Sequence, residues 1–481
     1  MQELRNERLS QEEFLKERKN VLSQWPTGRE VDLDEAIEYH YKLPPMKNIV
    51  RKLRHAKEHG EIYATSGMGK ATIEEQLELY KYVEKEGQAD ILGLSVDSLT
   101  RQNNYEKAEQ KWRESKSQGV SLLNGLPVVN VGVKGIRTLV EAVNCPIQPR
   151  YGAADARLCD EILIAGGCSS SAPDVFMDFW HHHGSVSLEY VIKTHQYCSR
   201  LLAYYEENGV PTLASSQGLY GAGIAPSLQI AHQIISILIQ VEQGVKNLGV
   251  MTVGHGNLVQ DVAAARARKT LIEKYLSHFG YHDIEIFFNV SFNLMEYPVH
   301  VGVNLAVVFM NTLMAKLTNS QLNDIRTLGE AKAIPTKEEI AFSFRSAKAM
   351  QNFLRHQKIF VDENAVQEEQ KMIEKEAECI LNKVLEMGDG DVVRGAIRAV
   401  EQGVLDHPFA ANRAAKGLVI CVKDNEGAVR YLEKGNLPFD KEILEYHREK
   451  IKEREYKKGR RITFDDVISD LYAVSKGILV E

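Results

Sequence analysis

The sequence predicts an α/β protein, in which a (β/α)8 TIM-type barrel at residues 61–356 follows an N-terminal helical arm at 1–60 and precedes an α-rich C-terminal subdomain at 357–481. One observation is the alternation of short apolar runs with helical patterns in the middle of the chain. About eight such units indicate a parallel barrel. The other observation is a change of residue pattern at both ends of the chain, where charged helical patterns replace the alternation of apolar runs and helices. Strand order is not visible in a sequence, so a doubly wound sheet is the alternative.

Each element follows from its local pattern. The arm is charged and is interrupted by a turn at 24–28. Apolar runs predict strands at 61–66, 91–96, 126–132, 146–150, 211–216, 248–253 and 284–291, with a poorer pattern at 315–319. Thr72 and Glu75 form a capping box before a helical pattern. Further helical patterns occupy 227–243, 259–279, 367–387, 392–400 and 441–456, with a candidate strand at 418–423.

Composition narrows the class of protein. The 481 residues are 44% hydrophobic and 26% charged, which is ordinary for a globular protein. A net charge of -7 argues against a general nucleic-acid binder, because phosphate contact favours a basic surface. The six cysteines include no CxxC pair, so we expect reduced thiols and no zinc ribbon. The charged first twenty residues and the lack of a spanning apolar window predict a cytoplasmic protein without a membrane partner.

Two arginines are the sharpest candidates for binding. Arg101 and Arg150 each stand just beyond, or at the end of, a predicted buried strand. Residues that hold anions often lie at that edge of parallel sheets. The planar guanidinium fork suits a carboxylate and stays charged when partly buried. The alternative is that each arginine pairs with a nearby acid, such as Asp97 or Asp155.

Glycine loops and a histidine tract carry weaker signals. The loops 66–69, 218–223 and 254–257 follow predicted strands and could hold phosphate, but none matches a known phosphate-binding pattern. Tight turns are the favoured interpretation. The three consecutive histidines at 181–183 cannot all face one ion on a regular element, so we predict a loop over the mouth and no metal site. No residue is assigned as a catalytic acid or base.

Several strings together resemble a known family: QWPTG at 24–28, LTRQNNY at 99–105, SLLNG at 121–125, NVGVKG at 130–135, EQGVKN at 242–247, AIPTKE at 333–338 and DNEGAVRYLEKGNLPF at 424–439. The chain resembles the large E component of glutamate mutase, also called methylaspartate mutase. The resemblance implies a barrel that works with adenosylcobalamin and interconverts L-glutamate and (2S,3S)-3-methylaspartate by a radical mechanism. It also implies a small S component that carries the cobalamin and the cobalt ligand, in a two-plus-two complex containing a homodimer of this chain. The Asp-x-His-x-x-Gly motif of that component is absent here.

The resemblance assigns roles to individual residues. Arg101 and Arg150 match arginines that hold the substrate carboxylates in the family. The predicted cofactor-binding positions are Gly69, Asn124, Tyr297, Arg326, Glu330 and Ile334, with Arg326 in place of a lysine and Tyr297 in place of a phenylalanine. Tyr151, beside Arg150, joins the predicted substrate set.

The substrate side departs from the family at four positions. Gly67 stands in place of a third substrate arginine, and Ala172 in place of the glutamate that meets the substrate amine. Asp178 and His182 replace two tyrosines, and both are predicted substrate residues. Losing one contact between a guanidinium and a carboxylate typically costs about 1.5–3 kcal/mol.

Three interpretations of these departures remain open. Asp178 and a protonated His182 could replace the lost contacts. The chain could be a divergent paralogue acting on another small carboxylic acid. It could also be a non-catalytic assembly subunit that binds the cobalamin-carrying partner.

Overall fold

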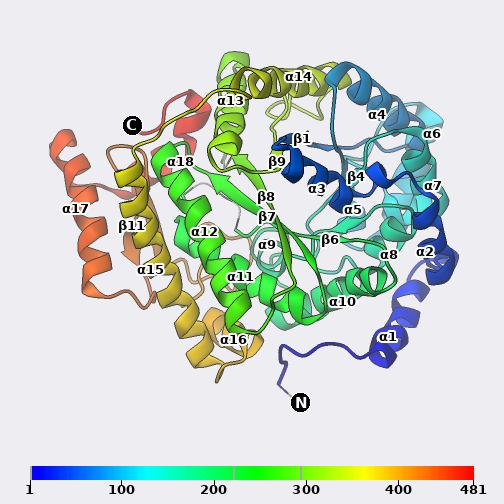
Figure 1. Ribbon diagram of the computed structural model, residues 1–481, viewed down its shortest axis with the longest axis horizontal. Coiled ribbons are helices and arrows are strands. Elements are labelled where there is room, and N and C mark those ends of the chain that lie inside the picture. Colours follow the sequence, from blue (N-terminus) through cyan, green and yellow to red (C-terminus); the bar gives the residue numbers. More distant parts are fainter. Residues whose placement is uncertain (1–2, 220, 222, 293–294) are drawn as a thin grey trace.

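The computed structural model describes residues 3–219, 221, 223–292 and 295–481. Within these residues the chain forms curled parallel sheets surrounded by helices, together with a two-stranded antiparallel sheet (Figure 1). The six-stranded parallel sheet has the order β1-β9-β8-β7-β6-β5, and the three-stranded one has the order β2-β3-β4. The strands are β1 (Tyr63–Thr65), β2 (Gly67–Met68), β3 (Leu92–Ser95), β4 (Ile147–Arg150), β5 (Ser170–Ser171), β6 (Leu213–Ser216), β7 (Asn247–Gly254), β8 (Glu285–Phe292), β9 (Leu322–Asp324), β10 (Val419–Lys423) and β11 (Val429–Lys434).

Helices separate most of the strands and cover the outside of the sheets (Figure 1). They are α1 (Gln11–Ser23), α2 (Leu33–Lys42), α3 (Ile49–His59), α4 (Ile73–Gly87), α5 (Ser98–Arg101), α6 (Tyr105–Gln118), α7 (Val128–Ala142), α8 (Arg157–Ala165), α9 (Val175–His181), α10 (Leu188–Glu207), α11 (Pro226–Glu242), α12 (Leu258–His278), α13 (Val301–Leu317), α14 (Lys337–Leu354), α15 (Glu363–Met387), α16 (Val392–Glu401), α17 (Lys441–Lys458) and α18 (Phe464–Ala473). Strands buried on both faces are typical of parallel sheets, and β7 is buried along almost its whole length.

The two parallel sheets are continuous in sequence at one edge. Only Ser66 separates β1 from β2, so one interrupted segment contributes to both sheets. At the other edge β4 contacts β5, but within the described part of the chain no strand ladder joins them. The predicted α/β class with parallel strands is therefore confirmed, and the parallel sheets are curled.

Two predicted strands are wrong. Residues 126–132 do not form a strand, because Pro127 caps helix α7, which begins at Val128. Leu126 forms only an isolated parallel bridge with Val96. A short apolar run does not distinguish a buried strand from a buried helix, and here Val129, before a kink at Gly132, and Val133, after it, are both buried. Residues 315–319 include the end of α13, and the strand of this unit is β9 instead.

Helix α11 lies at the centre of the core. All its residues from Pro226 to Val241 are buried, because it packs on α10, α12, α15 and α16 as well as on β6. A helix that is apolar on most sides requires such a surrounded position.

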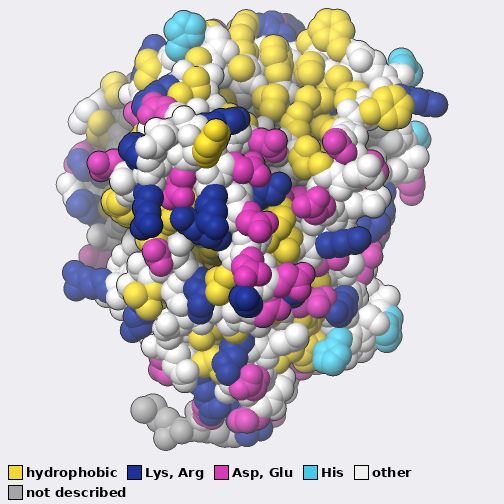
Figure 2. All heavy atoms as spheres, turned by 90° about the vertical axis from the view of Figure 1, so that its left-hand side faces the viewer, with side chains coloured by type: hydrophobic (Ala, Val, Ile, Leu, Met, Phe, Trp, Pro, Cys, Tyr) yellow, Lys and Arg dark blue, Asp and Glu magenta, His cyan; other side chains and the backbone are white. Residues whose placement is uncertain are grey.

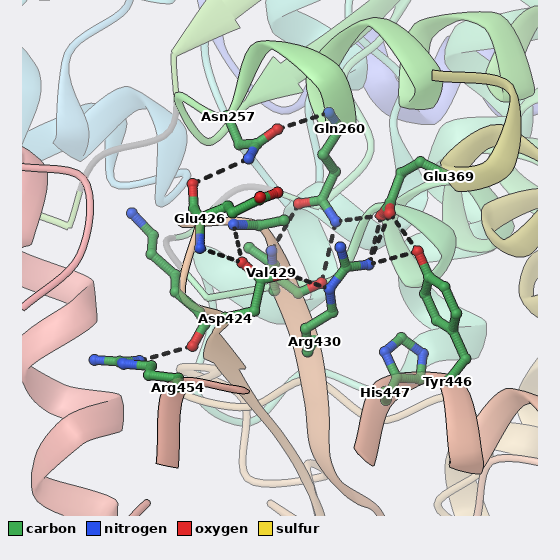
Figure 3. A network of polar contacts seen from close by, with 12 residues as sticks. Asn257, Gln260, Glu369, Asp424, Glu426, Val429, Arg430, Tyr446, His447 and Arg454 are labelled. Atoms are coloured by element: carbon green, nitrogen blue, oxygen red, sulfur yellow. Dashed lines mark hydrogen bonds and ion pairs between the residues drawn. The ribbon is translucent and has the colours of Figure 1, made fainter. Parts of the chain in front are cut away.

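The C-terminal region combines helices with the β10–β11 hairpin, as the predicted strand at 418–423 anticipated. A buried polar network joins it to the helix α12 (Figure 3). Arg430 of β11 pairs with Glu369 of α15 at 2.7 Å and with Asp424 at 2.8 Å. Gln260 of α12 donates to Glu369 at 2.8 Å and accepts from the backbone N–H of Val429 at 2.7 Å. Each buried charge therefore has an opposite partner.

The stretch before α1 is tied to distant parts of the chain. The backbone N–H of Asn6 donates to Asp391 at 3.0 Å, and its side-chain amide donates to the Leu238 carbonyl at 3.2 Å. The backbone N–H of Leu9 donates to Gln243 at 2.9 Å. Residues near the start of the chain are thereby fixed against α11 and the turn before α16.

Exposed hydrophobic side chains gather at one end of the molecule. Val301 and Phe309 of α13 and Phe342 and Phe353 of α14 are exposed. Figure 2 shows hydrophobic side chains concentrated near the top of one face, at the end where Figure 1 places these two helices. A patch of this kind commonly marks a contact surface.

Two further findings concern the predicted class. All six cysteines lie in described residues and are free thiols. Across the part of the chain that the structure describes, no helix is both long and apolar enough to cross a membrane.

Candidate functional site

Arg101 and Arg150 lie at the carboxyl ends of neighbouring strands. Ser95, the last residue of β3, is paired in register with Arg150, the last residue of β4. The chain then turns into the single-turn helix α5, which ends at Arg101. Asp97 caps this helix by accepting from the backbone N–H groups of Leu99 at 2.9 Å and Thr100 at 3.2 Å. The cap fixes the point from which the Arg101 side chain extends.

The Arg101 side chain is half-buried and has one nitrogen free to donate a hydrogen bond. Its Nε is buried and has no hydrogen-bond partner among the described residues. Burial lowers the pKa of Arg101, and the nearby carboxylates of Asp97 and Asp178 partly offset this effect. Arginine remains charged throughout the physiological range. Arg101 is therefore a cation that can still donate a hydrogen bond to a ligand.

Arg150 is paired with an acid that the sequence did not single out. Its Nη2 forms an ion pair with Asp324, the last residue of β9, and the two side chains are only 16% and 1% exposed. Asp324 Oδ1 is buried without a hydrogen-bond partner among the described residues. The pairing alternative thus holds for Arg150, but with Asp324, because Asp155 pairs with Arg157 at 2.7 Å.

The position of Asp324 relative to Arg326 could have marked it as a candidate site residue. It stands two residues before the predicted cofactor residue Arg326, in the place where the last barrel strand should end. The expectation of a strand at 315–319 concealed it.

Tyr151 and Asp178 are buried within hydrogen bonds. The Tyr151 hydroxyl bonds to Asp160 and, at 2.9 Å, to Ser171. Asp178 Oδ2 lies 2.7 Å from His195 Nε2, and both side chains are 2% exposed. Burial raises the pKa of Asp178 to about 6, although His195 opposes the rise. Burial alone would lower the pKa of His195, but the bond and charge of Asp178 raise it. The pair engages Asp178 Oδ2, whereas Asp178 Oδ1 is buried without a hydrogen-bond partner among the described residues.

The surroundings of His182 favour its neutral form. Burial and the neighbouring Arg101 charge lower the pKa of His182 to about 4. A contact between His182 and the substrate stays a prediction. The His182 ring fills the space beside Gly152, where a Cβ would lie 2.0 Å from the ring. This contact places His182 between the loops that carry Arg101 and Arg150.

The other two histidines of the tract have separate partners. His183 Nε2 accepts from the backbone N–H of Ala154 at 2.8 Å, and the His181 ring lies 4.6 Å from the His407 ring. Over the described ranges no group of three or more His, Cys, Asp or Glu residues could hold a metal ion.

The two positions that lack the expected charged residues differ in their surroundings. Ala172 is buried, at 5% exposure. A Cβ on Gly67 would meet only the Ser95 hydroxyl within 4 Å, at 3.1 Å. Neither position offers a charge to a ligand.

The predicted cofactor residues form two groups. In the first, Gly69 packs so closely that a Cβ would lie 2.8 Å from both the Ser95 carbonyl and Gly125 Cα. Exposed Asn124 lies nearby and accepts from the Ser98 N–H at 2.9 Å. This group adjoins α5 and therefore Arg101.

The second group lies on the loops that follow β8 and β9. The Arg326 guanidinium lies 5.3 Å from the centre of the Tyr297 ring. Glu330 Oε1 accepts from the backbone N–H and the hydroxyl of Thr327, at 2.8 and 2.6 Å. Ile334 is exposed.

The glycine loops behave as turns where they are described. Asp261 closes the 254–257 loop by accepting from the N–H groups of His255 and Gly256, at 2.8 and 2.9 Å. In the 218–223 loop, Tyr220 and Ala222 lie outside the described residues.

Hollows occur inside the sheets and at the amino ends of the strands. Arg150 lines a small internal pocket that also reaches Leu213 and Leu322, the first residues of β6 and β9. A larger hollow of about 840 Å³ lies at the amino ends of the strands. We favour the carboxyl ends, which carry Arg101 and Arg150, as the functional end, because catalytic residues of parallel α/β proteins lie there.

Comparison with known proteins identifies the family. Residues 43–481 match the model of the methylaspartate mutase E chain. A glutamate mutase epsilon subunit of Desulfitobacterium hafniense is 40% identical over 99% of each chain, and that of Treponema denticola is 38% identical over 99% of this chain and 98% of its own. One from Haloarcula marismortui is 34% identical over 99% of this chain and 96% of its own. A solved N-acetylneuraminic acid synthetase of Leptospira borgpetersenii covers 64% of this chain and 90% of its own, but a TM-score of 0.32 and 11% identity are too low to inform the fold. The match over nine-tenths of the chain and the full-length identities place this protein in the methylaspartate mutase E-chain family.

Proposed function

We propose that the chain is the E component of an adenosylcobalamin-dependent glutamate mutase, an isomerase that interconverts L-glutamate and (2S,3S)-3-methylaspartate. The observation that carries the proposal is the half-buried Arg101 guanidinium, with its unpartnered Nε, at the carboxyl ends of the strands, in a chain whose relatives are glutamate mutase epsilon subunits over nearly their full length. A guanidinium with spare donors suits a substrate carboxylate. The altered substrate side does not change this assignment, because Arg101 and Arg150 are both retained.

We also propose that the two parallel sheets form one eight-stranded barrel at residues 61–356, between an arm at 1–60 and a subdomain at 357–481. The ion pair between Arg150 of β4 and Asp324 of β9 supports this, since these strands belong to different sheets and are not neighbours. A hydrogen bond of 3.3 Å from Thr65 of β1 to Gln148 of β4 also links the sheets.

Within that barrel, Arg101 and Arg150 bind and orient the substrate. Tyr151, neutral His182 and the Asp178–His195 pair form its surroundings. Isomerisation by a migrating fragment needs no strong acid and base, so the task of these residues is to hold the substrate and exclude water.

The residues at the mouth fit adenosylcobalamin. Gly69 allows the backbone to approach a ligand closely. Asn124, Tyr297, Arg326, Glu330 and Ile334 would supply the remaining contacts, with Glu330 at the ribose. When bound, the cofactor supplies the carbon-centred radical that protein side chains cannot. The cobalt ligand would come from the partner.

The partner is a small cobalamin-binding S component in a two-plus-two complex in the cytoplasm. The exposed apolar residues of α13 and α14 support a chain that works within an assembly. Six unpaired cysteines agree with a reducing compartment.

The test combines this chain with an S component, adenosylcobalamin and L-glutamate. We expect 3-methylaspartate, detected by NMR spectroscopy, and its much slower formation when Arg101→Ala replaces the wild-type chain. A complex that assembles on size-exclusion chromatography but leaves glutamate unchanged would support a non-catalytic assembly subunit and overturn the proposal.

A further inference from the structure

Asp324 has an unused oxygen at the candidate substrate site. Its Oδ2 pairs with Arg150, and its Oδ1 is buried without a hydrogen-bond partner among the described residues. Buried polar atoms in native proteins are nearly always hydrogen-bonded, so an orphaned carboxylate oxygen calls for a ligand or an ordered water. The position of Asp324 at the carboxyl end of β9 favours a substrate.

The acids near Arg101 differ in what their oxygens already bind. Asp97 accepts from two backbone N–H groups of α5 and from the Thr100 hydroxyl. Asp178 Oδ2 is bonded to His195 at 2.7 Å, and its Oδ1, like that of Asp324, is buried without a hydrogen-bond partner among the described residues. Ala172, where the resemblance places the acid for the substrate amine, has no polar side chain. Asp324 differs from Asp178 in that its other oxygen is paired with Arg150, the arginine proposed to hold a substrate carboxylate.

We propose that Asp324 binds the ammonium group of the substrate through Oδ1, beside the carboxylate held by Arg150. The inference rests on the proposed function and adds a binding residue to the same site. In an amino acid the ammonium and carboxylate groups share one carbon, so an acid paired side by side with an arginine matches them. Arg101 then binds the second carboxylate.

The charges of the three side chains agree with this assignment. Arg101, Arg150 and Asp324 carry two positive charges and one negative charge. L-Glutamate carries two carboxylates and one ammonium at neutral pH, which is the complementary set. A dicarboxylic acid without the amine would leave Asp324 Oδ1 unpaired and close to added negative charge.

The experiment measures binding of L-glutamate and of glutarate, which lacks the amine, to the complex with the S component by calorimetry. We expect the wild-type complex to prefer L-glutamate by at least about tenfold. Asp324→Asn should weaken L-glutamate binding by about 10–100-fold and leave glutarate binding equal or tighter. Asp324→Asn also frees Arg150 from its ion pair, but this change affects the binding of both ligands alike. It therefore cancels in the ratio of the two affinities, which is the quantity compared. Asp283→Asn, at the opposite end of the strands and 71% exposed, is the matched control and should keep the preference.

Two results would overturn the assignment. One is a wild-type complex that binds glutarate as tightly as L-glutamate, a result that does not depend on any variant folding. The other is a folded Asp324→Asn complex that retains the preference. Asp324→Glu, which keeps the carboxylate, should retain part of it. If the proposed function itself fails, the wild-type complex will bind neither compound and form no product, which differs from a complex that isomerises glutamate without using Asp324.

Discussion

Arg101 and Arg150 differ in what surrounds their guanidinium groups, and the difference predicts different effects of substitution. Arg101→Ala removes a half-buried cation with an unpartnered Nε, so it should reduce kcat/KM by about 10–100-fold with little change in thermal stability. Arg150→Ala should reduce both, because it leaves Asp324 buried without its counter-charge, a loss of about 3–5 kcal/mol for fully buried pairs. Kinetics and thermal melts of the two variants measure the difference. Equal loss of stability in both would contradict it.

For single residues, the sequence predicted that Arg101 and Arg150 are binding candidates, but it did not predict the charged groups around them. The two arginines could be picked out because each follows an apolar run and because the ability of a guanidinium to bind a carboxylate does not depend on distant residues. Asp324 was missed because its pairing with Arg150 joins residues 174 positions apart. The charge state of His182 was not predictable from the sequence, because its pKa depends on burial and on the charge of Arg101, neither of which a sequence displays.

Among the elements, the β10–β11 hairpin depends on Arg430. Replacing it with methionine should lower the free energy of unfolding by about 3–5 kcal/mol, since Glu369 and Asp424 would remain buried and unpaired. Urea unfolding and limited proteolysis of the region after residue 357 provide the measurement. Arg448→Ala removes an ion pair with Glu455 whose arginine is 44% exposed, so this control should cost about 0–1 kcal/mol. A loss at Arg430 no greater than at Arg448 would show that the buried network does not stabilise the hairpin.

Elements were predictable where periodicity was long or flanked by clear signals. The strand at 284–291 corresponds closely to β8, and the helix at 259–279 to α12. The segment 126–132 failed because an apolar run of that length suits both structures, and only the capping position of Pro127 decides between them. Strand β5 was missed because two serines carry no apolar signal.

For the whole molecule, buried neutral histidines predict sensitivity to acid. Burial lowers the pKa of His40 to about 4 and of His232 and His255 to about 3. The unfolded chain binds these protons near pH 6.5, so stability should fall as pH drops from about 6.5 towards 4, by about 1.4 kcal/mol per pH unit for each such group. His195 acts in the opposite direction, since its pKa is raised.

Thermal midpoints recorded from pH 7.5 to pH 4.5 test this prediction. His232→Gln should make the decline shallower, whereas His356→Gln, at an exposed position, should leave its slope unchanged. A flat profile for the wild-type protein across this range would refute the prediction.

The ties formed by Asn6 and Leu9 also bear on how the chain folds during synthesis. Asn6 contacts Asp391, so this hydrogen bond can form only after the ribosome has synthesised the chain through residue 391. The segment around Asn6 is consequently among the last to become fixed, and a bulky group attached to it would disturb the start of α16.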